Sequence, residues 1–208
     1  MGSLVCHQIK ERTLLIDNIY LMVCARDTGI YIGIIFGIAF LALNRRLNAD
    51  WPPKLKHALI LILMMVPMII DGATSYMGVR NTDNLTRLIT GGFFGFPLAV
   101  FFVVARNYNP NKSNKIAPFK TSGELGAETF IFIIFISLVY NGIIPWAVVS
   151  SLLVMGIITM FYLIVDSIVS LIGISSENKR RAISLIGVCC IFVALYVLKR
   201  YVFGGLYI

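Results

Sequence analysis

Long apolar runs alternate with short polar stretches along this chain. The apolar runs cover residues 28–43, 57–77, 88–105, 128–140, 146–173 and 182–198. Runs of this length and composition predict helices that cross the hydrocarbon core of a bilayer. The pattern therefore predicts an all-α membrane protein, a polytopic helical bundle of about six transmembrane helices.

The first 27 residues do not fit this pattern. They contain an apolar stretch, but charged side chains interrupt and flank it at Lys10, Glu11, Arg12, Asp17, Arg26 and Asp27. Because charges are costly in hydrocarbon, we expect this stretch to form an interfacial or partly re-entrant helix. The chain then divides into an N-terminal interfacial segment, residues 1–27, which carries site residues, and a transmembrane bundle, residues 28–208.

Glycines in the first span predict how it packs. Gly29, Gly33 and Gly37 recur every four residues and therefore share one face of a helix. Small residues at this spacing let a second helix approach closely. We expect these glycines to serve packing.

Composition supports the membrane assignment and narrows the partners. Hydrophobic residues make up 58% of the chain and charged residues 13%, against roughly a quarter charged in soluble proteins. The formal net charge of +8 comes from basic residues that cluster in loops, as is usual in membrane proteins. We therefore expect membrane lipids, and no nucleic acid, as partners.

The distribution of basic residues predicts the orientation. Eleven of the 18 Lys and Arg residues lie in loops 44–56, 106–127 and 174–181, and the other seven lie on the opposite side. The side richer in basic loop residues faces the cytoplasm. We therefore expect a multi-pass protein of the cell membrane with both termini extracytoplasmic; the sequence leaves an oligomer open.

Residues able to bind a metal gather at the predicted extracytoplasmic face. Cys6, His7, Cys24 and Asp27 offer thiol, imidazole and carboxylate groups, the ligand types of zinc. Asp71 is a further candidate ligand, because a carboxylate within a span costs at least about 2.5 kcal/mol. The sequence equally leaves open a disulfide between the two cysteines on an oxidising exterior, or two free thiols.

Arginines on the same face form a second candidate site. Guanidinium groups bind phosphate through paired hydrogen bonds, and near a bilayer the obvious anion is the phosphate of a lipid or polyprenyl headgroup. The candidate anion-binding residues are Arg12, Arg26, Arg80, Asn84 and Arg87. The alternative is that the arginines form structural ion pairs with nearby carboxylates. Those carboxylates are Glu11, Asp27, Asp71 and Asp83.

Two stretches of the chain resemble one protein family. They are Cys6-His7-Gln8, Glu11-Arg12 and Cys24-Ala25-Arg26-Asp27-Thr28-Gly29-Ile30-Tyr31-Ile32-Gly33, then Asp71-Gly72-Ala73-Thr74, Gly78-Val79-Arg80, Asn84-Leu85-Thr86-Arg87 and Thr90-Gly91. They are similar to DUF2085, a family of small predicted membrane proteins, over roughly the first half of the chain. The resemblance implies a fold and a site but no reaction. Members of the family typically have a cysteine where this chain has Asp27. This departure weakens a site made of thiolates alone and leaves an oxygen ligand open at that position.

Metal, arginines and a histidine together favour one function. A bound metal polarises an oxygen or activates water, arginines neutralise developing charge, and His7 or Asp71 transfers protons as the catalytic acid or base. This combination indicates a metal-dependent hydrolase or transferase acting on a lipid-linked phosphate or another anionic lipid.

Two other functions remain open. Asp71 and Asp166 lie in the middle spans of the first and last three helices, and inverted halves with buried carboxylates are typical of transporters. The alternative is therefore a small transporter or channel built from two inverted three-helix halves. A structural subunit of a membrane complex is the third possibility.

Overall fold

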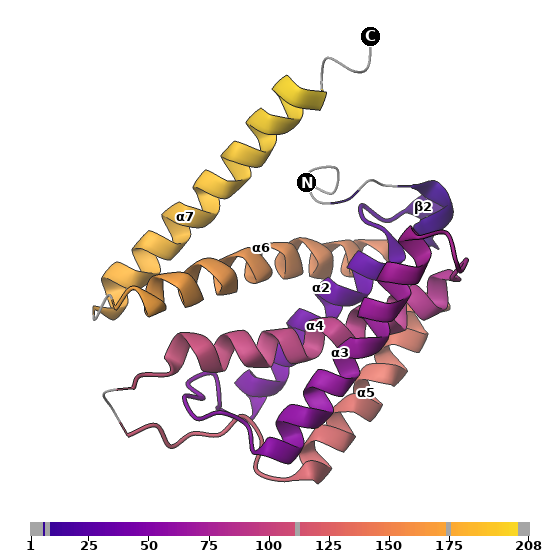
Figure 1. Cartoon of the computed structure of the whole chain (residues 1–208). Helices are drawn as coiled ribbons and strands as arrows, with labels where there is room; N and C mark the ends of the chain where they lie inside the picture. The colour runs from indigo at the N-terminus through magenta and orange to yellow at the C-terminus, as the bar shows by residue number, and fades with distance from the viewer. Residues whose placement is uncertain (1–5, 7–8, 111–112, 174–175, 204–208) are drawn as a thin grey trace.

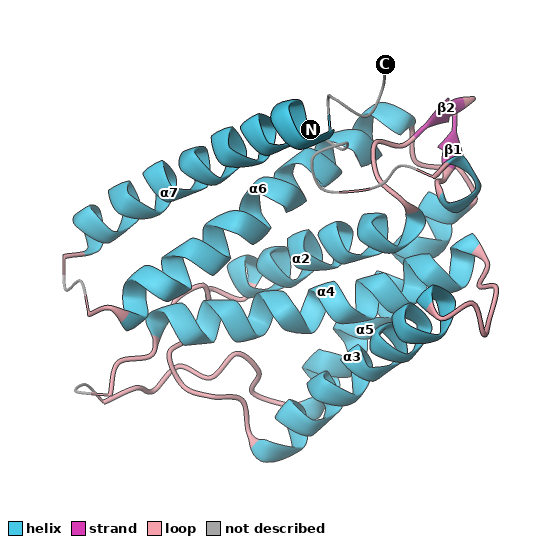
Figure 2. Cartoon of the chain, turned by 45° about the horizontal axis from the view of Figure 1, so that its top comes forward, coloured by secondary structure: helices cyan, strands magenta, loops and turns pink. Residues whose placement is uncertain are grey.

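Six long helices make up the fold. The structure is a computed structural model that describes residues 6, 9–110, 113–173 and 176–203 (Figure 1). The helices are α2 (Ala25–Leu43), α3 (Leu55–Tyr76), α4 (Asn84–Asn107), α5 (Ser122–Tyr140), α6 (Trp146–Leu171) and α7 (Glu177–Leu198), which continues into a π-helical turn, η2 (Lys199–Phe203). Each of the six is long and apolar enough to cross a membrane. The prediction of an all-α, six-span membrane protein is confirmed (Figure 2).

Three helices begin before their apolar runs do. The hydrophobic pattern indicated starts near residues 88, 128 and 182, whereas α4, α5 and α7 begin at Asn84, Ser122 and Glu177. Their first turns are polar, so hydrophobicity alone does not detect them. In α5 the Thr121 hydroxyl accepts a hydrogen bond of 3.3 Å from the backbone N–H of Glu124, which caps one of the unpaired amides of the first turn.

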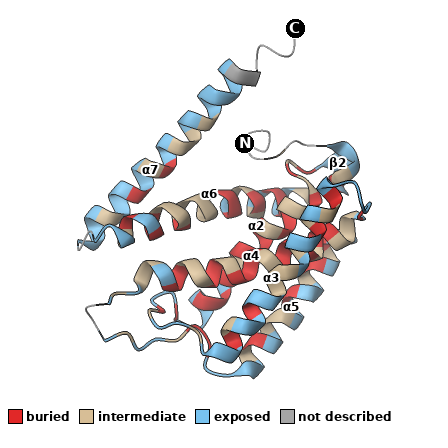
Figure 3. Cartoon of the chain, in the orientation of Figure 1, coloured by how far each residue is buried: buried red, intermediate tan, exposed pale blue. Residues whose placement is uncertain are grey.

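The centre of the bundle is the pair α2 and α4, whose backbones touch. A Cβ at Gly33 of α2 would collide with the carbonyl oxygen of Gly92, and a Cβ at Gly95 of α4 would collide with that of Ile30. Only glycine permits this approach, which is the close packing that the glycine spacing in the first span indicated. Buried residues accordingly concentrate on α2 and α4 (Figure 3).

The outer helices cover this pair unequally. α3 and α6 pack against it, whereas α7, as far as the structure describes it, packs substantially against α6 alone. α3 and α7 are exposed over most of their length (Figure 3), as expected of helices that face lipid. The two three-helix halves therefore differ: α2 lies along α4, but in the described residues α5 does not lie along α7. The packing does not reproduce the symmetry that two inverted halves would show.

Asp166 of α6 is bound at the end of the bundle where α4 ends. Its carboxylate, 0% exposed, lies 3.2 Å from Arg106 Nε and 3.3 Å from Arg180 Nε. It also accepts a hydrogen bond of 3.0 Å from the Ser184 hydroxyl. These contacts join α4, α6 and α7.

The N-terminal segment is a hairpin, which corrects the prediction of an interfacial helix there. It consists of a short 3-10 turn, η1 (Lys10–Arg12), followed by two antiparallel strands, β1 (Leu15–Ile16) and β2 (Ile19–Tyr20). The chain forms strands here instead of a helix because side chains alternate between the bundle and solvent, with Leu14 and Ile16 buried and Leu15 exposed. A period of two is that of a strand.

The hairpin turn and its anchor place this segment over one end of the bundle. Asp17 and Asn18 form the turn with φ of 52° and 60°, left-handed values that Asn and Asp tolerate better than most residues. The Asp17 carboxylate accepts a hydrogen bond of 2.8 Å from the backbone N–H of Trp146, and the carbonyl of Tyr20 accepts one of 3.3 Å from its indole. The hairpin is thus tied to the start of α6.

Candidate functional site

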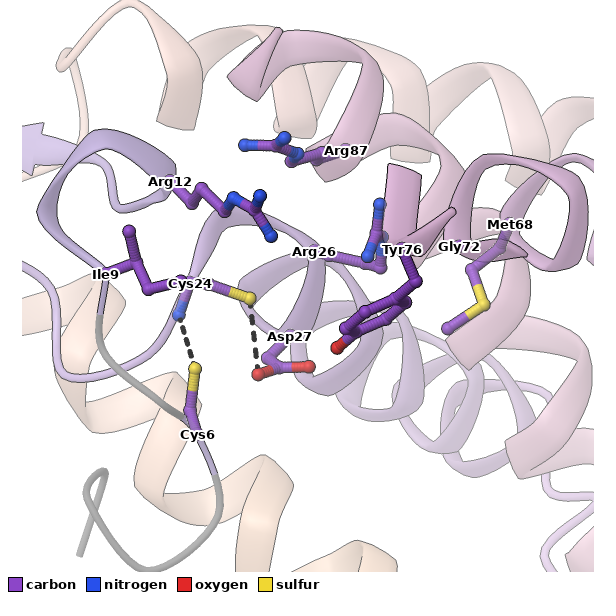
Figure 4. A pocket seen from close by; sticks show the side chains of 10 residues that line it. All are labelled: Cys6, Ile9, Arg12, Cys24, Arg26, Asp27, Met68, Gly72, Tyr76 and Arg87. Carbon is purple, nitrogen blue, oxygen red and sulfur yellow. Dashed lines mark hydrogen bonds between the residues drawn. The ribbon is translucent and has the colours of Figure 1, made fainter. Parts of the chain in front are cut away.

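A pocket of about 440 Å³ lies between the N-terminal segment, the start of α2, the end of α3 and the start of α4 (Figure 4). Its volume is in the range of ligand-binding pockets. The lining combines a thiol–carboxylate cluster, three arginines and an apolar strip. The lining residues are Cys6, Ile9, Arg12, Cys24, Arg26, Asp27, Met68, Gly72, Tyr76 and Arg87.

Two thiols and a carboxylate meet at one side of the pocket. Cys24 precedes the first turn of α2 and Asp27 lies within it, so the helix places both side chains on the same side. The backbone N–H of Cys24 donates to Cys6 Sγ at 3.2 Å, and the Cys24 thiol donates to Asp27 Oδ2 at 3.3 Å (Figure 4). The three ligand atoms lie within 4.8 Å of one another. Sequence positions 18 residues apart are thus brought to one point.

The surroundings of Cys24 favour its protonated form. Its hydrogen bond with Cys6 raises the pKa of the Cys24 thiol well above the ordinary value, and burial and the charge of Asp27 raise it further. A metal ion would have to displace this proton, because only the thiolate is a good metal ligand.

The donor set fits a zinc ion. Ligands of a tetrahedral zinc ion, with bonds of about 2.0 to 2.3 Å, lie roughly 3.3 to 3.8 Å apart, and the 3.3 Å from Cys24 Sγ to Asp27 Oδ2 is of this size. Cys6, Cys24 and Asp27 could supply three of the four ligands of such an ion. His7, predicted as a ligand and as the catalytic base, lies outside the described residues.

Asp71, also predicted as a metal ligand, is bonded to other residues and is not one of the three that form this cluster. Its carboxylate is 4% exposed and accepts a hydrogen bond of 3.0 Å from Arg26 Nε, beside a second contact from the same guanidinium. The Thr82 hydroxyl donates to its other oxygen at 2.6 Å. Asp71 is therefore a bound counter-ion of Arg26, and these bonds also occupy the oxygens that a proton-transferring role would need.

Arg12 and Arg87 face the thiol–carboxylate cluster and have no counter-ion among the described residues. Figure 4 shows both guanidinium groups on the same side of the pocket, above the Cys24 sulfur. Arg87 is 5% exposed, and its Nε is buried without a hydrogen-bond partner. Within the part of the chain that the structure describes, neither arginine forms an ion pair. Arg12 and Arg26 lie close enough to Arg87 to repel it electrostatically, and Asp71 lies close enough to attract it.

The other two members of the predicted anion site lie outside the pocket. Arg80 is exposed in the loop before α4. The Asn84 amide donates to the carbonyl oxygen of Glu11 at 3.3 Å, which fastens the N-terminal segment to α4. The five predicted residues therefore divide into three that line the pocket and two that do not.

The α3 wall of the pocket was not predicted from the sequence. Met68, Gly72 and Tyr76 line it, and they recur every four residues, so they share one face of α3. This four-residue spacing is present in the sequence. It does not indicate a pocket wall there, because apolar residues lie on every side of this helix.

Comparison with known proteins assigns a family. The model of the family described as "Predicted membrane protein (DUF2085)" matches residues 6–101. An uncharacterized protein of Methanothermobacter thermautotrophicus is 37% identical over 107 residues, which cover 50% of this chain and 88% of that protein. This chain belongs to the DUF2085 family.

The DUF2085 match coincides with the pocket. It contains every residue that lines the pocket and ends before α5 begins. A second relative, the uncharacterized protein MJ1492 of Methanocaldococcus jannaschii, is 36% identical over 102 residues, which cover 49% of this chain and 63% of that protein. The chain thus spans somewhat less than two thirds of this relative. No solved structure matches the chain.

Proposed function

We propose that the pocket binds a zinc ion and a phosphate group, and that this membrane protein is a metal-dependent hydrolase or transferase acting on a phosphate-bearing membrane lipid. One observation carries the proposal. A cluster of two thiols and a carboxylate shares one pocket with two arginines that have no counter-ion among the described residues. The first group suits a divalent metal, and the second suits a phosphate.

Burial makes Arg87 the stronger argument for an anion. A buried charge without a partner is costly, and an opposite charge that also accepts hydrogen bonds removes the cost. A phosphate offers several oxygens to the planar guanidinium fork. Arg12 lines the same pocket, so two forks are available to one phosphate.

The location of the pocket favours a lipid as the source of the phosphate. It lies where α2 and α4 begin and α3 ends. The ends of transmembrane helices lie at the level of the lipid headgroups. A lipid phosphate would therefore reach Arg12 and Arg87 without leaving the membrane surface.

The residues of the pocket divide the chemistry among them. When bound, the metal polarises a phosphoryl oxygen or activates water. Arg12 and Arg87 hold the phosphate oxygens and neutralise the charge that develops on them. Asp71 holds the guanidinium of Arg26 in place at 3.0 Å, and so keeps a third positive group at the pocket wall. His7, next to Cys6 in the chain, remains the proposed proton carrier.

The test measures metal content and turnover on the same preparations. We expect protein purified in detergent without chelator to contain about one equivalent of zinc, and the variant Cys24→Ser to lose it. The matched control is Cys190→Ser, which changes an exposed cysteine of α7 and should keep the metal. A zinc content below about a tenth of an equivalent, together with a Cys6–Cys24 disulfide in the mass spectrum, would overturn the metal site.

Turnover tests the catalytic part of the proposal. Dioleoyl phosphatidate and a polyprenyl phosphate in mixed micelles are followed by phosphorus NMR. We expect Arg87→Gln to lower kcat/KM by about 100-fold while zinc content stays the same, and Arg181→Gln, at the exposed start of α7, to leave both unchanged. Zinc-loaded protein that converts neither lipid would contradict the assignment as a hydrolase or transferase.

A further inference from the structure

The α3 wall of the pocket is apolar and runs away from the charged end. Met68, Gly72 and Tyr76 span about 12 Å along the helix at 1.5 Å per residue. Tyr76 is the last residue of α3 and is 80% exposed, as is common for tyrosine at a membrane interface. Met68 lies two turns deeper in the span. The pocket therefore extends from the membrane surface toward the hydrocarbon core.

Gly72 leaves open space in this wall. A Cβ built at Gly72 would meet no atom within 4 Å, whereas a Cβ at Gly91 or Gly95 would collide with the backbone of α2. The glycines of the α2–α4 pair are thus explained by close packing, and Gly72 is not. The absence of a side chain at Gly72 widens the pocket beside α3.

The same side of the pocket faces the bilayer. α3 is the helix at this wall, and it is exposed along most of its length. Its neighbouring residues Ile69 and Ile70 are exposed apolar side chains that fit a lipid environment. Nothing polar lines the pocket between Tyr76 and Met68 on α3.

We infer that the strip of Met68, Gly72 and Tyr76 holds the hydrocarbon chain of the lipid whose phosphate is bound by Arg12 and Arg87, and that the lipid enters sideways from the bilayer past Gly72. This inference rests on the proposed function. The occupant follows from the two ends of the pocket. One end is positively charged at the headgroup level, and the other is apolar and lies deeper, which is the polarity of a lipid phosphate lying in its own leaflet. A soluble phosphate would leave the apolar strip without an occupant.

The test compares two ligands that share the phosphate and differ in the chain. Binding of dioleoyl phosphatidate in mixed micelles and of inorganic phosphate is measured on wild type, Gly72→Ala and Gly72→Leu. We expect Gly72→Leu to weaken the lipid by about tenfold, the effect of losing contact with about two buried methylene groups. Gly72→Ala should have a smaller effect in the same direction. The affinity for inorganic phosphate should not change in either variant.

A matched control separates a filled groove from a changed helix. Gly126 of α5 is also a helical glycine with no atom within 4 Å of a Cβ, and it lies far from the lining residues. Gly126→Leu should leave both affinities at the wild-type values. Both leucine variants should fold, because leucine favours helices more than glycine does.

The outcomes distinguish this inference from the proposed function. If wild type binds neither ligand, the proposed function itself fails. If wild type binds both and Gly72→Leu keeps full affinity for the lipid, the chain does not lie beside Gly72 and the inference fails alone. Equal weakening of lipid and phosphate would also overturn it, because the substitution would then act on the arginines rather than on the chain.

Discussion

Arg26 connects the two polar groups of the pocket. Its guanidinium lines the pocket and also holds Asp71, whose carboxylate is almost completely buried. A lone aspartate in a transmembrane helix costs about 2.5 to 3.5 kcal/mol on insertion scales. Arg26 and the Thr82 hydroxyl remove this cost by satisfying both oxygens. The ion pair therefore supports α3 and fixes one wall of the site.

This pair predicts a large loss of stability when it is broken. Asp71→Asn leaves Arg26 without its counter-ion and should lower the free energy of unfolding by about 3 to 5 kcal/mol. Combining it with Arg26→Gln should restore part of the loss, since no charge then remains unpaired. The measurement is unfolding by SDS in detergent micelles.

The control for this experiment is an exposed pair on α7. Glu177 and Arg181 are 63% and 56% exposed, and pairs in water contribute at most about 1 kcal/mol. Glu177→Gln should therefore have little effect. Similar small effects in both pairs would show that Asp71 does not depend on Arg26.

Residue types in the sequence were enough to indicate the cluster but not its membership. Cys24 and Asp27 are three residues apart, and a helix brings such residues together whatever the rest of the fold does. Asp71 had several possible partners, and only the packing of α3 against α4 decided in favour of Arg26. Likewise Arg80 and Arg87 looked equivalent until the start of α4 at Asn84 left one in a loop and buried the other.

The α2–α4 pair holds the start of each helix at the pocket. Both helices contribute lining residues from their first turns, namely Arg26 and Asp27 on α2 and Arg87 on α4. The glycine contacts begin directly below, where Gly91 would collide with the carbonyl of Arg26 if it carried a side chain. The spacing between the two helices therefore sets the distance between the thiol–carboxylate cluster and Arg87.

Gly95 is the position that tests this packing. Gly95→Ala would place a methyl group against the carbonyl of Ile30, so the helices must separate, and we expect the free energy of unfolding to fall by about 1 to 3 kcal/mol. Gly126→Ala meets open space and should leave stability equal or slightly higher. Thermal unfolding in detergent compares the two variants. Equal stability of both would mean that the backbones of α2 and α4 do not touch.

Secondary structure could be predicted from the sequence wherever the hydrophobic pattern was long and uniform. The six spans were predicted because each is a long apolar run. The hairpin was not, because each of its strands has only two residues and its turn, Asp17-Asn18, lacks the glycine that marks most such turns. The polar first turn of α5 was missed for a related reason: Thr121 and Glu124 signal a helix start by capping, while hydrophobicity at those positions indicates a loop.

At the scale of the whole molecule the two ends of the bundle differ in character. One end carries the hairpin and the pocket with Cys6 and Cys24. The other end carries basic loops, and there Arg46 is fixed by Glu124 through two hydrogen bonds of 2.7 and 3.1 Å. The hydrogen bonds with Glu124 raise the pKa of Arg46 above its ordinary value, so Arg46 stays positively charged at physiological pH. The prediction that this end faces the cytoplasm rests on the number of basic residues in its loops.

Orientation is tested by placing single cysteines at the two ends. In a background in which all four native cysteines are replaced by serine, the variants are Ile143→Cys, which is 65% exposed between α5 and α6, and Ser113→Cys in the loop before α5. A membrane-impermeant maleimide should label Ile143→Cys in intact cells and Ser113→Cys only after the membrane is opened. The reverse pattern would place the pocket in the cytoplasm and the basic loops outside.

The two buried aspartates also bear on how the chain enters the membrane as it is made. Asp71 is held by Arg26, and Asp166 is approached by Arg106. In both cases this arginine precedes the aspartate in the sequence: Arg26 lies in the first turn of α2 and Arg106 in the last turn of α4. As the ribosome releases the chain from its N-terminus, each carboxylate therefore reaches the insertion machinery after its counter-ion has already been delivered to the correct face. For Asp71 the arginine partner is complete at that point, whereas Asp166 gains its second arginine, Arg180, only when α7 has been made.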